Sequence, residues 1–87
     1  MWFLFIVIFY KMYLIIVGYN GEYVTINCDE TCTIKTIKEI IRDKLNIDCG
    51  NQCLTFGKKV LNNYVQINKY GIVDGCTILL SFQEKGG

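Results

Sequence analysis

The first regular pattern along the chain is a pair of strand-like segments separated by a turn signal. Residues 12–17 are apolar, aromatic or β-branched throughout. Residues 23–28 alternate, with the apolar side chains of Val24 and Ile26 on one face. The dipeptide Asn-Gly at positions 20–21 is typical of a tight hairpin turn, because both residue types tolerate positive φ angles. The pattern therefore predicts a β-hairpin.

The next segment has the periodicity of an amphipathic helix of about three turns. Thr33 is a suitable N-cap, because its hydroxyl can accept a hydrogen bond from a first-turn amide. Asn46 can end the helix, since asparagine tolerates the left-handed conformation that follows many helices. Between them we predict a buried apolar stripe and a charged face in water. The stripe consists of Ile34, Ile37, Ile41 and Leu45, and the solvent face of Lys35, Lys38, Glu39 and Asp43.

Three further apolar segments follow the helix. They cover residues 54–56, 59–61 and 77–82, and the last one alternates so that Ile78 and Leu80 point inward. A compact loop with apolar anchors separates the last two segments. The resulting order, β-β-α-β-β-β without an internal repeat, predicts an α+β domain in which the helix covers one face of the sheet.

An uninterrupted apolar run, WFLFIVIFY, occupies residues 2–10, and Lys11 ends it. The run is too short for a transmembrane helix, which needs about 20 apolar residues. It also lacks the basic start and the small-residue cleavage site of a secretory signal. Three interpretations stay open: an extension upstream of a true start at Met12, a short membrane anchor, or a cleaved signal. We expect residues 1–11 to be a hydrophobic extension, with membrane contact only if residues 1–10 are retained as an anchor.

Composition narrows the classes of function. The 87 residues suffice for one small domain, and a hydrophobic content of 52% is too high for a disordered chain. There is no histidine, so the usual general base and the commonest zinc ligand are both missing. A net charge of +1 with interspersed signs provides no basic stripe for nucleic acid. We therefore expect a binding or carrier module without catalytic residues, metal or cofactor.

The pair Gly86-Gly87 closes the sequence. Glycines are common in fraying termini, so the pair alone is weak evidence of function. Two residues without side chains also form a thin tail, whose carboxylate can thread a narrow enzyme channel. Both interpretations are compatible with the residues themselves.

The order of elements, the stretches DKLNI, LTFGKKVL and NKYGI, and the final Gly-Gly resemble ubiquitin and its relatives without a gap over residues 12–87. The resemblance implies a β-grasp fold, a mixed sheet of four to five strands with one helix packed across it. It also implies two segments, the extension at 1–11 and a ubiquitin-like domain with a Gly-Gly tail at 12–87. We expect such a domain to work in the cytoplasm and nucleus.

The resemblance further implies a protein modifier that is not itself an enzyme. The carboxylate of Gly87, preceded by Gly86, would be activated with ATP and joined to lysines of target proteins. The implied partners are activating, conjugating and ligating enzymes, deconjugating proteases and the targets. The lysines that match the chain-building lysines of ubiquitin are Lys38, Lys44 and Lys59.

The recognition surface departs from that of ubiquitin. The patch of ubiquitin is aliphatic and contains one histidine. The matching residues of this chain include Thr55 at the centre and Leu79 at the histidine position. Val17 replaces a neighbouring lysine, which favours a shifted apolar patch, and Gln83 occupies the tail position that activating enzymes read. The resemblance thus implies a partner-binding surface made of Val17, Tyr19, Thr55, Leu79, Ser81 and Gln83.

Five cysteines are many for a chain of this length. Two Cys-x3-Cys pairs suggest a zinc site, but the resemblance places one pair before the helix and the other after it. A helix of about 12 residues rises about 18 Å, which is too far for one coordination sphere. We therefore expect reduced thiols, some of them buried as small apolar residues. The cysteines are Cys28, Cys32, Cys49, Cys53 and Cys76.

Two alternative functions share the same fold and tail. The first is a ubiquitin-like leader that is cleaved from a ribosomal-protein fusion. The segment Gln83-Glu84-Lys85 suits this alternative, because it differs from the basic segment that ubiquitin carries before its glycines. The second is a sulfur-carrier protein, which carries a thiocarboxylate on the same Gly-Gly end. The long ungapped match to ubiquitin argues against the sulfur carrier and for a ubiquitin-like protein.

Overall fold

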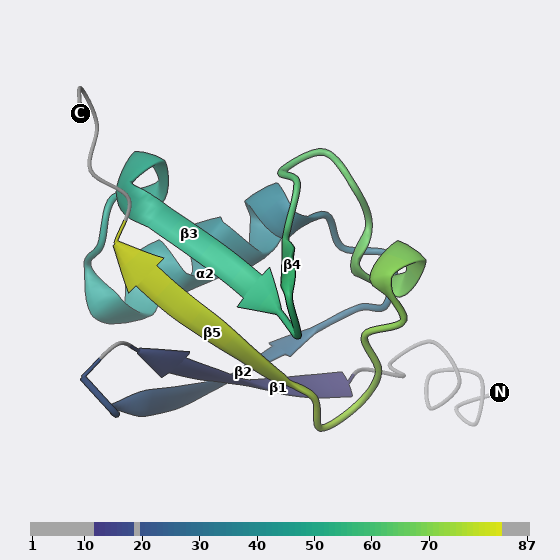
Figure 1. The fold of residues 1–87 in the computed structure, drawn as a ribbon, viewed down its shortest axis with the longest axis horizontal. Helices are drawn as coiled ribbons and strands as arrows, with labels where there is room; N and C mark the ends of the chain where they lie inside the picture. Colours follow the sequence, from purple (N-terminus) through teal and green to yellow (C-terminus); the bar gives the residue numbers. More distant parts are fainter. Residues whose placement is uncertain (1–11, 19, 83–87) are drawn as a thin grey trace, which may run out of the picture.

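The computed structural model describes residues 12–18 and 20–82, and shows one helix packed across a five-stranded sheet (Figure 1). Expectations for residues 1–11, Tyr19 and the tail from Gln83 to Gly87 fall outside these residues. Within the described part, no helix is long and apolar enough to cross a membrane. The elements are β1 (Met12–Gly18), β2 (Tyr23–Cys28), α2 (Ile34–Leu45), η1 (Cys49–Asn51), β3 (Gln52–Phe56), β4 (Lys59–Val60), η2 (Ile67–Tyr70) and β5 (Thr77–Phe82).

The strands form one mixed sheet in the order β2-β1-β5-β3-β4. The last strand, β5, lies at the centre, parallel to β1 on one side and antiparallel to β3 on the other. The β1–β2 and β3–β4 pairs are antiparallel. The predicted β-grasp fold is therefore confirmed, with the helix between the two hairpins in sequence and against one face of the sheet (Figure 1).

The hydrophobic core lies between that face and α2. The helix contributes three fully buried isoleucines, and the strands contribute alternate residues, as period-2 patterning requires. The predicted inward direction of Ile78 and Leu80 is confirmed, since both are buried. The main members of the core are Leu14, Ile16, Ile26, Ile34, Ile37, Ile41, Leu54, Ile67, Ile72, Ile78 and Leu80.

The predicted turn between β1 and β2 is confirmed by its hydrogen bonds. The Gly21 amide donates to the Gly18 carbonyl at 3.0 Å, and the Gly18 amide donates to the Glu22 carbonyl at 2.7 Å. Gly21 has a φ of 90°, which a side chain would disfavour. The Asn20 Oδ1 atom accepts from the Glu22 amide at 3.2 Å and stiffens the turn further.

Both ends of α2 lie at the predicted capping residues. Thr33 is extended, and its Oγ1 atom accepts from the Thr36 amide at 3.3 Å. Asn46 is left-handed, with a φ of 62°, and its amide donates to the Arg42 carbonyl at 2.7 Å. At the first turn, the Ile34 amide donates to the carbonyl of Val65 at 3.1 Å. A loop distant in sequence thus satisfies an amide that the helix itself leaves free.

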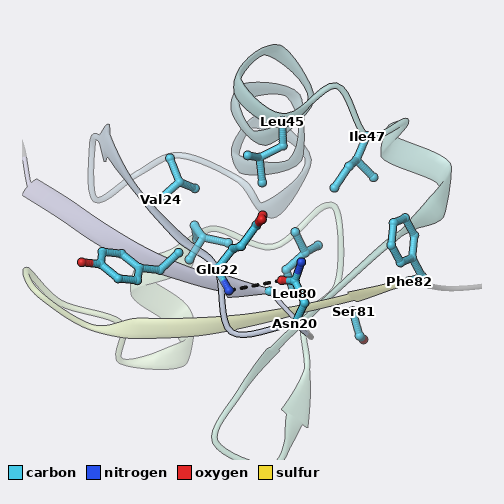
Figure 2. Close-up of a pocket in the computed structure, with 11 residues that line it drawn as sticks. Asn20, Glu22, Val24, Leu45, Ile47, Leu80, Ser81 and Phe82 are labelled. Carbon is cyan, nitrogen blue, oxygen red and sulfur yellow. Dashed lines mark hydrogen bonds between the residues drawn. The ribbon is translucent and has the colours of Figure 1, made fainter.

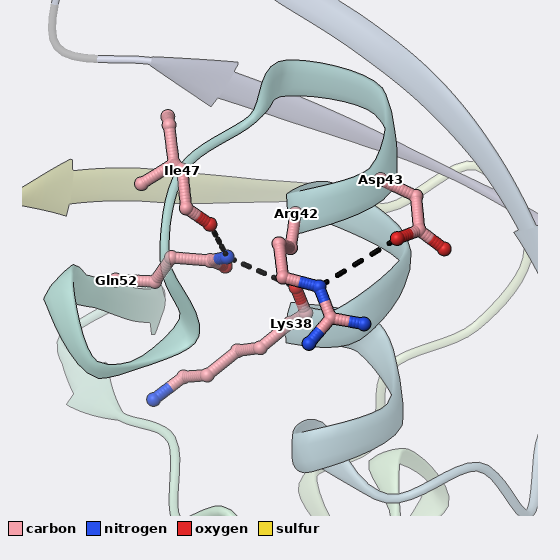
Figure 3. A network of polar contacts seen from close by, with 5 residues as sticks. All are labelled: Lys38, Arg42, Asp43, Ile47 and Gln52. Atoms are coloured by element: carbon pink, nitrogen blue, oxygen red, sulfur yellow. Dashed lines mark hydrogen bonds and ion pairs between the residues drawn. The ribbon is translucent and has the colours of Figure 1, made fainter.

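The prediction for α2 was wrong at one position on each of its two faces. Lys38 is 8% exposed, whereas Leu45, predicted in the buried stripe, is exposed. The buried stripe is Ile34, Ile37, Lys38 and Ile41, because the segment after the helix turns back along that side. In Figure 3 the Lys38 side chain runs past Gln52 with its ammonium group directed away. The aliphatic stem is thus covered, which is a common arrangement for lysine.

Gln52 joins the helix to the segment that follows it (Figure 3). The side chain is 1% exposed, and its Nε2 atom donates to the carbonyl of Lys38 at 2.9 Å and to that of Ile47 at 3.0 Å. The nearby ion pair between Arg42 and Asp43, at 3.6 Å, is exposed and contributes little. The buried amide therefore sets how the chain leaves α2 and enters β3.

Cys28, at the end of β2, is a buried member of the core. Burial, with smaller contributions from Cys32 and Asp29, raises the pKa of its thiol from 9.0 to about 11. The protonated thiol is therefore the form that the folded protein favours, in agreement with the expected role as a small apolar residue.

We expect Thr33→Ala to lower the free energy of unfolding by about 1 kcal/mol, because the first turn of α2 loses its capping acceptor. Urea unfolding followed by circular dichroism measures this change. Thr33→Ser keeps a hydroxyl and serves as the matched control, with a smaller loss expected. Equal losses for the two variants would show that the cap contributes no stability.

The pKa of Cys28 predicts a stability that depends on alkaline pH. Between about pH 9 and pH 11 the thiol ionises in the unfolded chain but stays protonated in the folded one, so the free energy of unfolding falls as pH rises. The expected fall is on the order of 2 kcal/mol. Urea unfolding across this range measures it, and Cys28→Ala should flatten the slope. Identical slopes for the two proteins would contradict the assignment.

Candidate partner-binding surface

The strand register brings three of the predicted surface residues into line. Val17 pairs with Leu79 across β1 and β5, and Leu79 pairs with Thr55 across β5 and β3. Residues directly opposite each other on neighbouring strands project from the same face of a sheet. The same line continues to β2, where Tyr23 pairs with Val17, and to β4, where Val60 pairs with Thr55. We call these five residues, one from each strand, the transverse row.

The transverse row lies on the outer face of the sheet, opposite α2. Leu79 is 51% exposed, whereas its neighbours Ile78 and Leu80 are buried in the core. At the two ends of the row, Tyr23 is 75% exposed and Val60 is 68% exposed. Val17 and Thr55 are half-buried between them. The row is therefore an accessible band, mostly apolar, that crosses the whole width of the sheet.

The outer face of the described strands carries no charged side chain. A molecule that contacts only these residues would bind through apolar contacts and neutral hydrogen bonds, with little dependence on salt. A charge-free face is notable in a chain with 20% charged residues. Its outward residues are Tyr13, Ile15, Val17, Tyr23, Thr25, Asn27, Cys53, Thr55, Val60, Thr77, Leu79 and Ser81.

The structure describes only some of the predicted surface residues. Ser81 pairs with Cys53 on the outer face, next to the transverse row. Tyr19 and Gln83 lie outside the described residues. Sequence reasoning missed Tyr23 and Val60, although the alternation in β2 already separates Tyr23 from the buried face. Val60 could be found only through its register across the turn that joins β3 and β4.

A recess with a volume of about 220 Å³ lies beside the end of β5 (Figure 2). We call it the tail recess, because Phe82 on its rim immediately precedes the tail segment 83–87. Its walls come from the β1–β2 turn, the end of α2 and β5. In Figure 2, Leu45 lies across the recess from Leu80. The exposure of Leu45 therefore has a structural explanation, since its side chain lines this opening instead of the closed core.

The three candidate acceptor lysines occupy different environments. Lys44, at the end of α2, and Lys59, in β4, are exposed. Lys38 is buried along most of its side chain. An enzyme that joins another molecule to an amine must reach its nitrogen atom, so access favours Lys44 and Lys59.

The two Cys-x3-Cys pairs lie on opposite sides of α2 in the chain. Cys28 and Cys32 precede α2, and Cys49 and Cys53 follow it. The Sγ atom of Cys76 accepts a hydrogen bond from the Val73 amide at 3.4 Å and thus supports the loop before β5. In the part of the chain that the structure describes, no three histidine, cysteine or acidic residues are grouped to hold a metal ion.

Comparisons with known proteins agree with this architecture. The chain is 38% identical over 65 residues to "Ubiquitin-like protein NEDD8-like protein 2" of Dictyostelium discoideum, a match that covers 75% of this chain and 81% of that protein. Its fold is similar to that of the UBL domain of Plasmodium falciparum Dsk2, with a TM-score of 0.82 and 22% identity, over 85% of this chain and 100% of that domain. The model of the ubiquitin family matches residues 14–85. The chain therefore belongs to the ubiquitin family.

Proposed function

We propose that this protein is a ubiquitin-like modifier, joined through the carboxylate of Gly87 to lysines of target proteins after activation with ATP. The observation that carries the proposal is the place of Gly86 and Gly87, four and five residues beyond Phe82, where the last strand of the β-grasp sheet ends. The similarity to a NEDD8-like protein supports it. Domains of this fold and family are in general modifiers or protein-binding domains and not enzymes.

The chemistry resides in the tail and in other enzymes. The Gly87 carboxylate attacks the α-phosphate of ATP, which releases pyrophosphate and leaves an acyl adenylate. An enzyme thiol then displaces AMP and forms a thioester. Finally a lysine amine of the target displaces the thiol, loses a proton and forms an isopeptide bond. Each enzyme needs close access to the carbonyl carbon, and glycine provides it because no side chain blocks the approach.

The folded domain would supply the recognition. Activating, conjugating, ligating and deconjugating enzymes need a surface that identifies this modifier, and the transverse row is an exposed band suited to that role. The tail recess lies where an enzyme that holds residues 83–87 would also contact the domain. Leu45 and Phe82 offer apolar contacts there. These two surfaces would distinguish this modifier from ubiquitin, whose patch is aliphatic with one histidine.

We place this activity in the cytoplasm and nucleus. All five cysteines are free, which suits a reducing compartment. Lys44 and Lys59 would be the acceptor sites for chains of the modifier, because both are exposed.

Deletion of Gly87 should abolish conjugation, because the remaining carboxylate is displaced by one residue from the position that the enzymes read. Tagged full-length protein labelled with heavy glycine is incubated with cell lysate and ATP, and reducing gels reveal high-mass conjugates. Trypsin cleaves after Lys85, so a conjugated lysine keeps a heavy Gly-Gly remnant that mass spectrometry separates from that of ubiquitin. Lysate without ATP is the control. Heavy remnants from the deleted protein would refute the proposal.

Leu79→Lys should slow loading onto the activating enzyme about tenfold, or ~1.4 kcal/mol, if the transverse row is read. The substitution puts a charge at the centre of a neutral band, and the exposed position should keep the fold intact. The rate of thioester formation measures the effect. The matched control is Val73→Lys, because Val73 is also exposed but lies in the loop before β5. Equal rates for the two variants would show that the enzyme reads another surface.

A second candidate is a ubiquitin-like leader that is cleaved from a fusion after Gly87. The tail supports it, because Gln83-Glu84-Lys85 lacks the basic segment of ubiquitin. The open reading frame distinguishes the two, since a fusion continues past Gly87 into a segment rich in lysine and arginine. A stop codon after Gly87 would exclude the leader.

A further inference from the structure

The outer face of the sheet carries exposed apolar side chains that no other element of the described chain covers. The transverse row exposes Tyr23, Leu79 and Val60. On β1, the outward residues Tyr13 and Ile15 extend this apolar area from the start of the strand to Val17 in the row. Exposed apolar areas of this kind are in general covered by another chain segment or by a partner.

A suitable occupant lies in the same sequence. Residues 2–10 are apolar or aromatic without a single charge, and Lys11 joins them to Met12 at the start of β1. Exposure of this apolar run to water is unfavourable, as is exposure of the apolar side chains on the outer face. Neither the run nor the outer face carries a charge, so the two are electrostatically compatible. We propose that residues 2–10 dock on the outer face of the sheet and cover the transverse row.

The lengths permit this docking. From Met12 to Val17 the path along β1 is about 17 Å, and Leu79 lies one strand spacing, about 4.8 Å, further. Nine residues in extended conformation span up to about 30 Å. The run can therefore turn back at Lys11 and reach the centre of the row with residues to spare.

Tethering favours this occupant over a second copy of the chain. A short covalent link gives the segment an effective concentration in the millimolar range, well above the concentration at which a second copy is normally present. The docking requires no conjugation, so its test is independent of the proposed function.

Trp2 provides a probe inside the segment, because it is the one tryptophan of the chain. In the full-length protein at low micromolar concentration, docking should shift its emission to the blue relative to the denatured chain and protect it from acrylamide. Nuclear Overhauser contacts between the Trp2 ring and the methyl groups of Leu79, Val17 or Val60 would locate it on the row. An emission typical of free tryptophan in water would overturn the proposal.

A matched pair of variants tests the position of the contact. Tyr23→Lys places a charge at one end of the row, and Tyr64→Lys changes an equally exposed tyrosine, 81% exposed, in the loop after β4. Acrylamide quenching of Trp2 should rise severalfold in Tyr23→Lys and stay unchanged in Tyr64→Lys. Val60→Lys repeats the test from the other end of the row, in case Tyr23→Lys disturbs the fold. Equal quenching in all variants contradicts docking on this face.

Two further measurements separate the other occupants. Protection of Trp2 that disappears on dilution, together with a dimer in analytical ultracentrifugation, would assign the face to a second copy and overturn the proposal. Protection that appears only with phosphatidylcholine vesicles would assign the segment to a lipid surface, with the same consequence. Protection that is independent of concentration and of vesicles, and sensitive to Tyr23→Lys, supports docking within one chain.

Discussion

The parallel pairing of β1 with β5 is the interaction on which the rest of the structure depends. It joins the first described strand to the last, from Ile15 opposite Thr77 to Gly18 opposite Leu80. The Ile15 amide also donates to the carbonyl of Cys76 at 3.0 Å, just before β5 begins. Parallel neighbours require a long crossover connection, and here α2 and the β3–β4 hairpin lie within it. The pairing therefore encloses the helix and places the strand that leads into the tail at the centre of the sheet.

This central position gives β5 two roles through the alternation of its side chains. Ile78 and Leu80 close the core against the helix, whereas Leu79 projects to the opposite face as the middle of the transverse row. A shift of one residue in register would exchange these roles, because every side chain would change face. The binding surface and the core are thus coupled by one set of backbone hydrogen bonds. Phe82, at the end of the same strand, adds the rim of the tail recess.

Most of the fold could be predicted, because the signals were local. The strand alternation, the Asn-Gly turn and the caps at Thr33 and Asn46 each depend on residues within a few positions of one another. The environments of Lys38 and Leu45 could not be predicted in the same way. Helical periodicity defines a stripe but not its exact centre, and the centre depends on Gln52, which hydrogen-bonds to the Lys38 carbonyl from 14 positions away. Packing by a distant segment thus rotated the buried face.

The candidate site shows the same division. The sequence by itself predicted the elements, and its resemblance to ubiquitin predicted a surface that includes Val17, Thr55 and Leu79. Only the tertiary structure decided that Tyr23 and Val60 continue this surface to both edges of the sheet. Alternation predicts which residues share a face within one strand, but not which residue of another strand lies opposite. That register is set by the turns and by the β1–β5 pairing, so the row exists only once the strands have assembled.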